Sequence, residues 1–428
     1  MLIVMLAMLL GSAPRALAES GDDDPSAPVP PSVNKGHLGT YRVEQPDGNA
    51  YWVYVPSTYS DDHPAGLHLF FHGQNGQNWA QYFDSWTGPF LTTYNLIGIN
   101  MQYMDGDNGR DTPGKTAAAR RAVAQVIADY KILVGRGTIS SFSGGGLPHA
   151  LWASAAFKNR GTDWPFCQTT LYSSNYRMSV TGGCPMSWFV SVGTDEWALA
   201  TLGVDGFHRV GELYQDVERG GCPDIQFMIL KSKGHWVDPR EVAASAAEFG
   251  RADLAFAPFV YTADYPEQEL RGIVHACDAL DLGRASSAIS SLKKRTTLPA
   301  ALAAKLAALS QLVDDRLQHL AAMATQLAAQ DPPLATYYLQ IYRQEARGTP
   351  TEKVIRQAIT SCSHDAHYQS GMDAYGAFIE LFPNLLGGDG ASPAPVPDKV
   401  ADLSEIVKHL NPSSQTGMMA ANLLALAP

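Results

Sequence analysis

The spacing of apolar and polar positions changes near residue 262 of this chain. Before that point, short apolar runs take turns with stretches of helical spacing, which is typical of a sheet layered with helices. After that point the strand-like runs stop and helical spacing continues alone. The pattern therefore predicts an α/β unit followed by an all-α unit.

The first unit is predicted to be an eight-stranded, doubly wound and mostly parallel sheet. Its first two strands form an antiparallel pair around the turn at 45–48. The predicted strands are 40–44, 51–55, 67–71, 96–101, 137–142, 169–173, 186–192 and 225–230. The predicted helices between and after them are 115–130, 147–156, 205–219 and 241–249.

The second unit is predicted to be a bundle of antiparallel helix pairs. Leucines at helical spacing fall on one side of a long helix at 298–323, and a buried core is the first interpretation of that stripe. A surface for a protein or cell-envelope partner is the second. The shorter predicted helices are 267–282, 333–347, 352–362, 372–382, 402–410 and 416–426.

The N-terminus is expected to be a secretory signal peptide. Residues 1–10 are apolar, and Ala16 and Ala18 form a small-x-small cleavage site. The segment lacks Lys or Arg before its apolar run, which leaves open whether Met1 is the true start. The predicted organisation is a signal peptide at 1–18, a disordered linker at 19–34, a catalytic domain at 35–262 and a helical domain at 263–428. The protein is expected to be secreted, or placed in the periplasm or cell envelope.

Composition and net charge indicate a globular protein and exclude one kind of partner. The chain has 428 residues, 45% hydrophobic and 17% charged, which is ordinary for a globular protein of two domains. The net charge is −11, whereas binding to nucleic acid needs a basic face. Nucleic acid is therefore excluded as a partner.

Five cysteines remain after the predicted cleavage, and spacing cannot fix their pairing. An oxidising compartment would favour some disulfides, with 167–184 and 277–362 as the two pairings considered. The odd number leaves at least one free thiol. Cys362, His364 and His367 lie close together, but they are interpreted as a polar helix end, and no metal site is expected.

The segment around Ser143 is the first candidate for chemistry. An apolar strand ends in Ser-Gly-Gly-Gly at 143–146, and a helix is predicted to follow at once. A nucleophilic serine on such a strained turn needs small residues two positions before and after it. Ser141 and Gly145 meet that need, so the motif G-x-S-x-G is present with serine in place of its first glycine.

A nucleophilic serine also needs a base and an orienting acid. In doubly wound hydrolases these follow in the order serine, acid, histidine, just past the carboxyl ends of strands. The strand at 186–192 leads to Asp195, and the strand at 225–230 leads to His235. We therefore predict Ser143 as the nucleophile, His235 as the general base and Asp195 as the acid. In the alternative, Asp195 caps a helix and Glu196 is the acid.

The oxyanion hole is predicted from two backbone amides. One belongs to Gln74, in the turn after the strand at 67–71, and the other to Gly144, after the nucleophile. His72, beside the first of these, is interpreted as structural. The expected mechanism needs no cofactor and no metal.

Together these motifs resemble secreted esterases of the α/β-hydrolase fold, and most closely the poly(3-hydroxybutyrate) depolymerase-like and feruloyl-esterase-like enzymes. The resemblance covers about half of the chain, roughly 36–256, and departs from the family at Ser141 and Gln74. It implies a serine esterase whose substrate is a small-molecule or polymeric carboxylic ester. The motifs that carry it are Tyr51-Trp-Val-Tyr-Val-Pro56, His72-Gly73, Ser143-Gly-Gly, Gly193-Thr-Asp195 and Gly234-His235.

Two rival functions stay open. A prolyl-oligopeptidase-like peptidase shares the fold and the residue order, but such enzymes usually carry a large propeller domain. The other rival is a hydrolase-like module without catalysis, joined to a helical protein-interaction domain. Labelling by a fluorophosphonate separates the second rival from an enzyme, because only an activated serine reacts.

Overall fold

The structure is a computed structural model of the chain. It describes residues 36–73, 87–103, 112–156, 164–174, 186–196, 212–213, 216–217, 224–295, 298–330, 332–365, 368–382, 385, 397–412 and 414–427. The predicted signal peptide and linker lie outside these ranges. So do Gln74, His367, Cys184 and Cys222.

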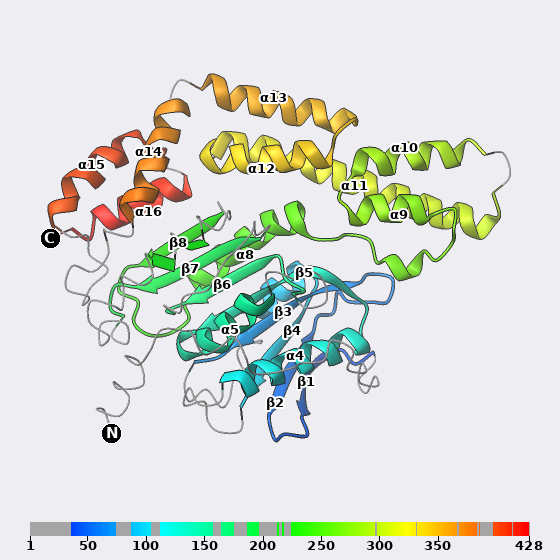
Figure 1. Ribbon diagram of the computed structural model, residues 1–428, viewed down its shortest axis with the longest axis horizontal. Helices are drawn as coiled ribbons and strands as arrows, with labels where there is room; N and C mark the ends of the chain where they lie inside the picture. The colour runs from blue at the N-terminus through cyan, green and yellow to red at the C-terminus, as the bar shows by residue number, and fades with distance from the viewer. Residues whose placement is uncertain are drawn as a thin grey trace.

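One eight-stranded sheet forms the centre of the α/β half (Figure 1). Its strands lie in the order β1-β2-β4-β3-β5-β6-β7-β8, and β2 alone runs antiparallel to its neighbours. This order fits the α/β-hydrolase sheet that the sequence predicts. The strands are β1 (Gly39–Glu44), β2 (Ala50–Val55), β3 (Ala65–Phe71), β4 (Leu96–Gln102), β5 (Ile132–Phe142), β6 (Gln168–Tyr172), β7 (Ser187–Gly193) and β8 (Ile225–Leu230).

Helices cover both faces of this sheet, so side chains on both sides of its central strands are buried. Every residue of β3 is buried, and so is every residue of β7. Helices α4 (Thr112–Asp129) and α5 (Gly146–Ala156) pack on one face. Helices α3 (Gly88–Thr93) and α8 (Pro239–Phe256) pack on the other. The parallel strands therefore end along one edge, where their following loops meet.

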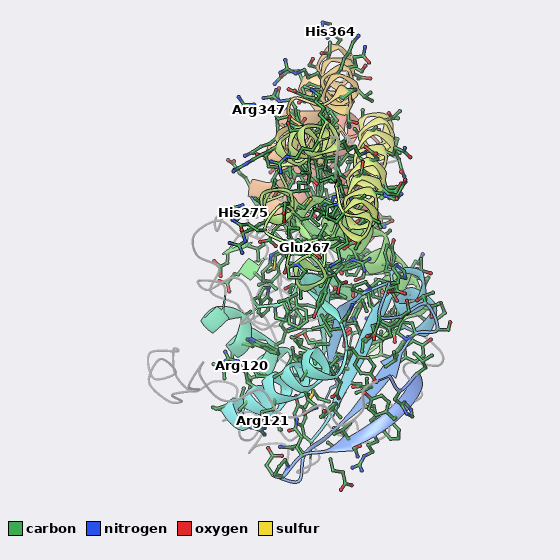
Figure 2. All side chains as sticks on the ribbon, turned by 90° about the vertical axis from the view of Figure 1, so that its right-hand side faces the viewer. Arg120, Arg121, Glu267, His275, Arg347 and His364 are labelled. Carbon is green, nitrogen blue, oxygen red and sulfur yellow. The ribbon has the colours of Figure 1, made fainter. Side chains whose placement is uncertain are left out.

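After α8, the described part of the chain contains helices and their connecting segments but no strand. In a perpendicular view these helices stand at one end of the molecule, with Arg347 and His364 far from Arg120 and Arg121 of α4 (Figure 2). None of the described helices is long and apolar enough to cross a membrane. The helices are α9 (Arg271–Asp278), α10 (Leu282–Lys293), α11 (Ala300–Gln330), α12 (Pro332–Glu345), α13 (Pro350–His364), α14 (Tyr368–Leu381), α15 (Val400–His409) and α16 (Gln415–Leu424).

These helices divide between two hydrophobic clusters. Helices α9, α10, α12 and α13 pack with the end of α8 around the leucine stripe of α11. The stripe is therefore part of a core, as predicted. Helices α14 to α16 instead join the cluster that contains the sheet. Phe382, just past α14, places its ring 5.0 Å from Phe227 of β8 in an edge-to-face pair. The last helices therefore complete the core of the α/β half.

Buried polar groups connect α9–α13 to the sheet half. Arg316 of α11 pairs with Glu345 of α12 at 2.9 Å and also donates to the carbonyl of Leu254 in α8. The hydroxyl of Tyr338 in α12 donates to the carboxylate of Asp224, the residue before β8. Because these groups are buried, separating the two halves would leave charges and hydrogen-bonding groups without partners.

Two expectations need correction. The helix expected at 267–282 is shorter, at Arg271–Asp278 (α9), and the helix α10 that follows it was not expected. The two are separate because Leu280 has a left-handed φ of 53° and the side chain of Asp281 caps α10. Cys167, Cys277 and Cys362 are free, so the pairings 167–184 and 277–362 are wrong. All three thiols are buried and pack as small hydrophobic side chains.

Candidate active site

The nucleophile turn has the geometry that its small residues predict. Strand β5 ends at Phe142, Ser143 has a left-handed φ of 51°, and a short 3-10 turn leads into α5. A Cβ on Gly145 would lie 2.4 Å from the carbonyl oxygen of Phe71 and 2.5 Å from that of His72, so only glycine fits there. Serine is tolerated at the earlier small position, because Ser141 is buried with its Oγ 3.0 Å from Nδ1 of His149.

His235 lies in the loop after β8 and faces this serine. Its Nε2 is 2.7 Å from Oγ of Ser143, within hydrogen-bonding distance. The ring packs against Phe142, with the two centroids 4.7 Å apart, and the side chain is 12% exposed. The structure therefore brings together two residues that are 92 positions apart in sequence, as the sequence analysis expects.

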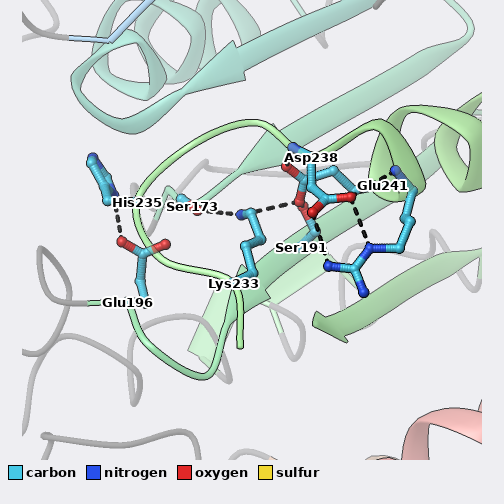
Figure 3. A network of polar contacts seen from close by, with 8 residues as sticks. Ser173, Ser191, Glu196, Lys233, His235, Asp238 and Glu241 are labelled. Atoms are coloured by element: carbon cyan, nitrogen blue, oxygen red, sulfur yellow. Dashed lines mark hydrogen bonds and ion pairs between the residues drawn. The ribbon is translucent and has the colours of Figure 1, made fainter. Parts of the chain in front are cut away.

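The carboxylate that contacts His235 is that of Glu196, the alternative considered, and not that of Asp195, so the prediction of Asp195 is corrected. Nδ1–H of His235 donates to Oε1 of Glu196, whose side chain is fully buried (Figure 3). Asp195 is exposed, and its carboxylate accepts from the hydroxyl of Thr194 at 3.0 Å. The backbone N–H of Asp195 donates to the carbonyl of Lys233 at 2.9 Å, and in this turn the side chain of Asp195 is exposed while that of Glu196 is buried.

This arrangement sets the tautomer of the imidazole. With the proton on Nδ1 held by the Glu196 carboxylate, Nε2 is left as the acceptor for the hydroxyl of Ser143. The same carboxylate would stabilise the imidazolium that forms when the ring takes that proton. The geometry is therefore that of a serine activated by an oriented base.

Only part of the predicted oxyanion hole lies within the described residues. Gly144 follows Ser143 in the 3-10 turn, on the N-terminal side of α5, where backbone amides favour negative charge. Gln74 lies outside the described ranges. Its neighbour Gly73 comes so close to the nucleophile that an added Cβ would lie 3.1 Å from Cβ of Ser143. The chain just after β3, at Gly73, therefore lies beside Ser143.

The other histidines near the sheet are not bases. Burial lowers the pKa of His149 to about 3, and its ring stacks between Phe71 and Trp164. Nδ1 of His72 lies 2.6 Å from the carbonyl of Gly73, in keeping with its structural interpretation. In the described ranges, no cluster of three or more His, Cys, Asp or Glu side chains could hold a metal ion.

Comparison with known proteins adds little to this geometry. No family model matches the chain, and no curated protein matches it. The native structure of the esterase Est2 from the Planctomycetes species Thermogutta terrifontis overlaps 51% of this chain and 91% of its own, with 12% identity and a TM-score of 0.39. Its propionate-bound form overlaps 50% and 92%, with 12% identity and a TM-score of 0.39. A thermostable esterase overlaps 51% and 62%, with 14% identity and a TM-score of 0.35. Similarity this weak carries no argument about activity, so the function rests on the site itself.

Proposed function

We propose that this protein is a serine hydrolase of carboxylic esters. The observation that carries the proposal is one chain of contacts. The imidazole of His235 bonds a serine on a left-handed turn through Nε2 and a buried carboxylate through Nδ1. Each of these features has a defined part in acyl transfer.

In the proposed reaction, Oγ of Ser143 attacks the ester carbonyl while Nε2 of His235 takes its proton. Glu196 holds the ring and stabilises the imidazolium. The amide of Gly144, together with that of Gln74, donates to the oxyanion of the tetrahedral intermediate. His235 then returns the proton to the leaving alcohol, and water hydrolyses the acyl-enzyme by the same steps. The chemistry needs no cofactor.

The sequence resemblance to depolymerase-like and feruloyl-esterase-like enzymes supports ester chemistry over peptide hydrolysis. No strand follows β8 in the described residues, so these show none of the β-structure of the propeller that prolyl-oligopeptidase-like enzymes usually carry. Secretion through residues 1–18 is part of the proposal, and sequencing the N-terminus of protein from the culture supernatant would test it. A partner for the helical half stays a prediction.

The decisive experiment treats the folded protein with a fluorophosphonate and measures turnover of short p-nitrophenyl esters. Wild type should be labelled at Ser143 and should hydrolyse the esters, whereas Ser143→Ala should do neither. A folded wild-type sample that the probe does not label would overturn the proposal and favour the non-catalytic alternative. A panel of acyl lengths with feruloyl and polyhydroxybutyrate substrates would then identify the ester class.

A further inference from the structure

A fully buried lysine lies two residues before the histidine. Lys233 is in the loop at 231–238, which connects β8 to α8 and carries His235. Its side chain has no exposure to solvent. The ammonium lies 3.1 Å from Oε2 of Glu241 and donates to Oγ of Ser173 at 2.7 Å (Figure 3). A lysine is almost never fully buried unless it is paired, so this position has a specific environment.

Glu241 holds both ends of the same loop. It lies in the first turn of α8 and is also fully buried. Its Oε1 accepts from the backbone N–H of Asp238, at the end of the loop, at 2.7 Å. Its Oε2 accepts from the hydroxyl of Ser191 in β7 and contacts Lys233, near the start of the loop. The Glu241 carboxylate therefore contacts the loop at Lys233 and at Asp238, on either side of His235.

The backbone around Lys233 connects the histidine loop to the acid turn. The carbonyl of Lys233 accepts from the N–H of Asp195 at 2.9 Å. The N–H of Ser232 donates to the hydroxyl of Thr194 at 2.7 Å. Any shift of the loop at residue 233 would therefore change the separation between His235 and the turn that carries Glu196.

Stability alone does not explain a pair of this kind. Taking two charges out of water is costly, and apolar residues of similar volume often stabilise a core as well or better. Leaving one of the two charges alone is much worse than replacing both. A test can therefore separate the cost of an unpaired charge from the loss of the loop's position.

We infer that Lys233 and Glu241 are positioning residues, which fix the histidine loop so that His235 reaches Ser143 and Glu196 at the same time. This inference rests on the proposed function. A mutation outside the reacting groups that displaces them by about 1 Å can lower the rate on the order of 100-fold. Removing the pair should therefore lower kcat and leave KM nearly unchanged, because neither residue contacts the exposed mouth of the site.

The experiment compares Lys233→Met, the double variant Lys233→Met/Glu241→Gln and a matched control. The control is Arg316→Met, which breaks the buried Arg316–Glu345 pair of α11 and α12, away from the site. The readouts are kcat and KM on p-nitrophenyl esters, the rate of labelling by a fluorophosphonate, and the Tm. Lys233→Met should lower Tm, kcat and the labelling rate, the last two by about 100-fold. Arg316→Met should lower Tm but leave kcat and the labelling rate at the wild-type level.

The double variant separates the effect of a misplaced histidine loop from the effect of an unpaired buried charge. It leaves no buried charge alone, so it should regain much of the lost Tm, yet kcat should stay low because the bond to Ser173 is missing. It also supplies the measurement if Lys233→Met alone does not fold. Wild-type kcat in either folded variant would overturn the inference while the proposed function stands. Absence of labelling in wild type would instead overturn the proposed function.

Discussion

The choice between two adjacent carboxylates can be tested by changing each to its amide. Glu196→Gln keeps the size of the side chain, and the amide oxygen can still accept from His235, but the negative charge is lost. The Glu196 side chain is fully buried, so water cannot reach the site to stabilise the imidazolium in place of the lost carboxylate charge. Two unit charges about 4 Å apart interact by about 4 kcal/mol at an effective dielectric constant of about 20. This energy corresponds to about 1,000-fold in rate.

A second estimate gives a similar size, since the acid-to-amide change in a serine protease triad costs about 10⁴ in kcat. We therefore expect Glu196→Gln to lower kcat by about 10³ to 10⁴. Asp195→Asn should change kcat by less than about threefold, because an exposed carboxylate bound to a neighbouring hydroxyl contributes little. The assay is initial-rate kinetics on a p-nitrophenyl ester, with circular dichroism to verify that both variants are folded. A larger loss in Asp195→Asn than in Glu196→Gln would refute the assignment.

Three further predictions follow from close packing and burial. Gly145→Ala should abolish most activity because its Cβ would collide with backbone carbonyls under the nucleophile, whereas Gly272→Ala, which faces open space, should keep full activity in the same ester assay. Phe382→Ala should lower the free energy of unfolding by about 3–5 kcal/mol in urea titrations, and exposed Val354→Ala by less than about 0.5 kcal/mol; equal effects would contradict the packing of α14 on the sheet. Burial lowers the pKa of His68 from 6.5 to about 3, so the unfolded chain takes the proton first and stability is lost as the pH falls below about 6.5. Replacing it by His68→Leu should therefore reduce the stability lost between pH 7 and pH 5 by about 2 kcal/mol, and an unchanged loss would show that this ring is accessible to protons.

The sequence is sufficient for the eight strands of the sheet and for the meeting of Ser143 with His235. Strand ends in a parallel sheet share one edge, so residues that follow those strands must converge there. The choice between Asp195 and Glu196 depends on how this turn is held by the loop after β8, for example by the bond from the N–H of Asp195 to the carbonyl of Lys233, which no local pattern records. The alternation of inward and outward side chains along a strand does not continue through the turn that follows it, so it cannot say which of the two carboxylates points inward.

Long-range packing accounts for the other features that the sequence did not predict. Lys233 sits in a polar loop, where a lysine is normally solvated, and its burial depends on a glutamate in the next helix. The amphipathic pattern of α14 to α16 predicts that these helices bury one face, but not that the buried face lies on β8. Helix α10 was not predicted, although Asp281, whose side chain caps it, is a good N-cap residue.

The return of the last helices to β8 has a consequence for biosynthesis. Phe227 belongs to a strand near the middle of the chain, while α16, which joins the same cluster, begins at residue 415, which is 188 residues later (415 − 227). At about 5–20 residues per second, a ribosome takes about 10–40 seconds to add that length. Throughout that interval the part of the sheet around β8 is without the cover that α16 provides, so the α/β half reaches its final packing only after α16 has been made.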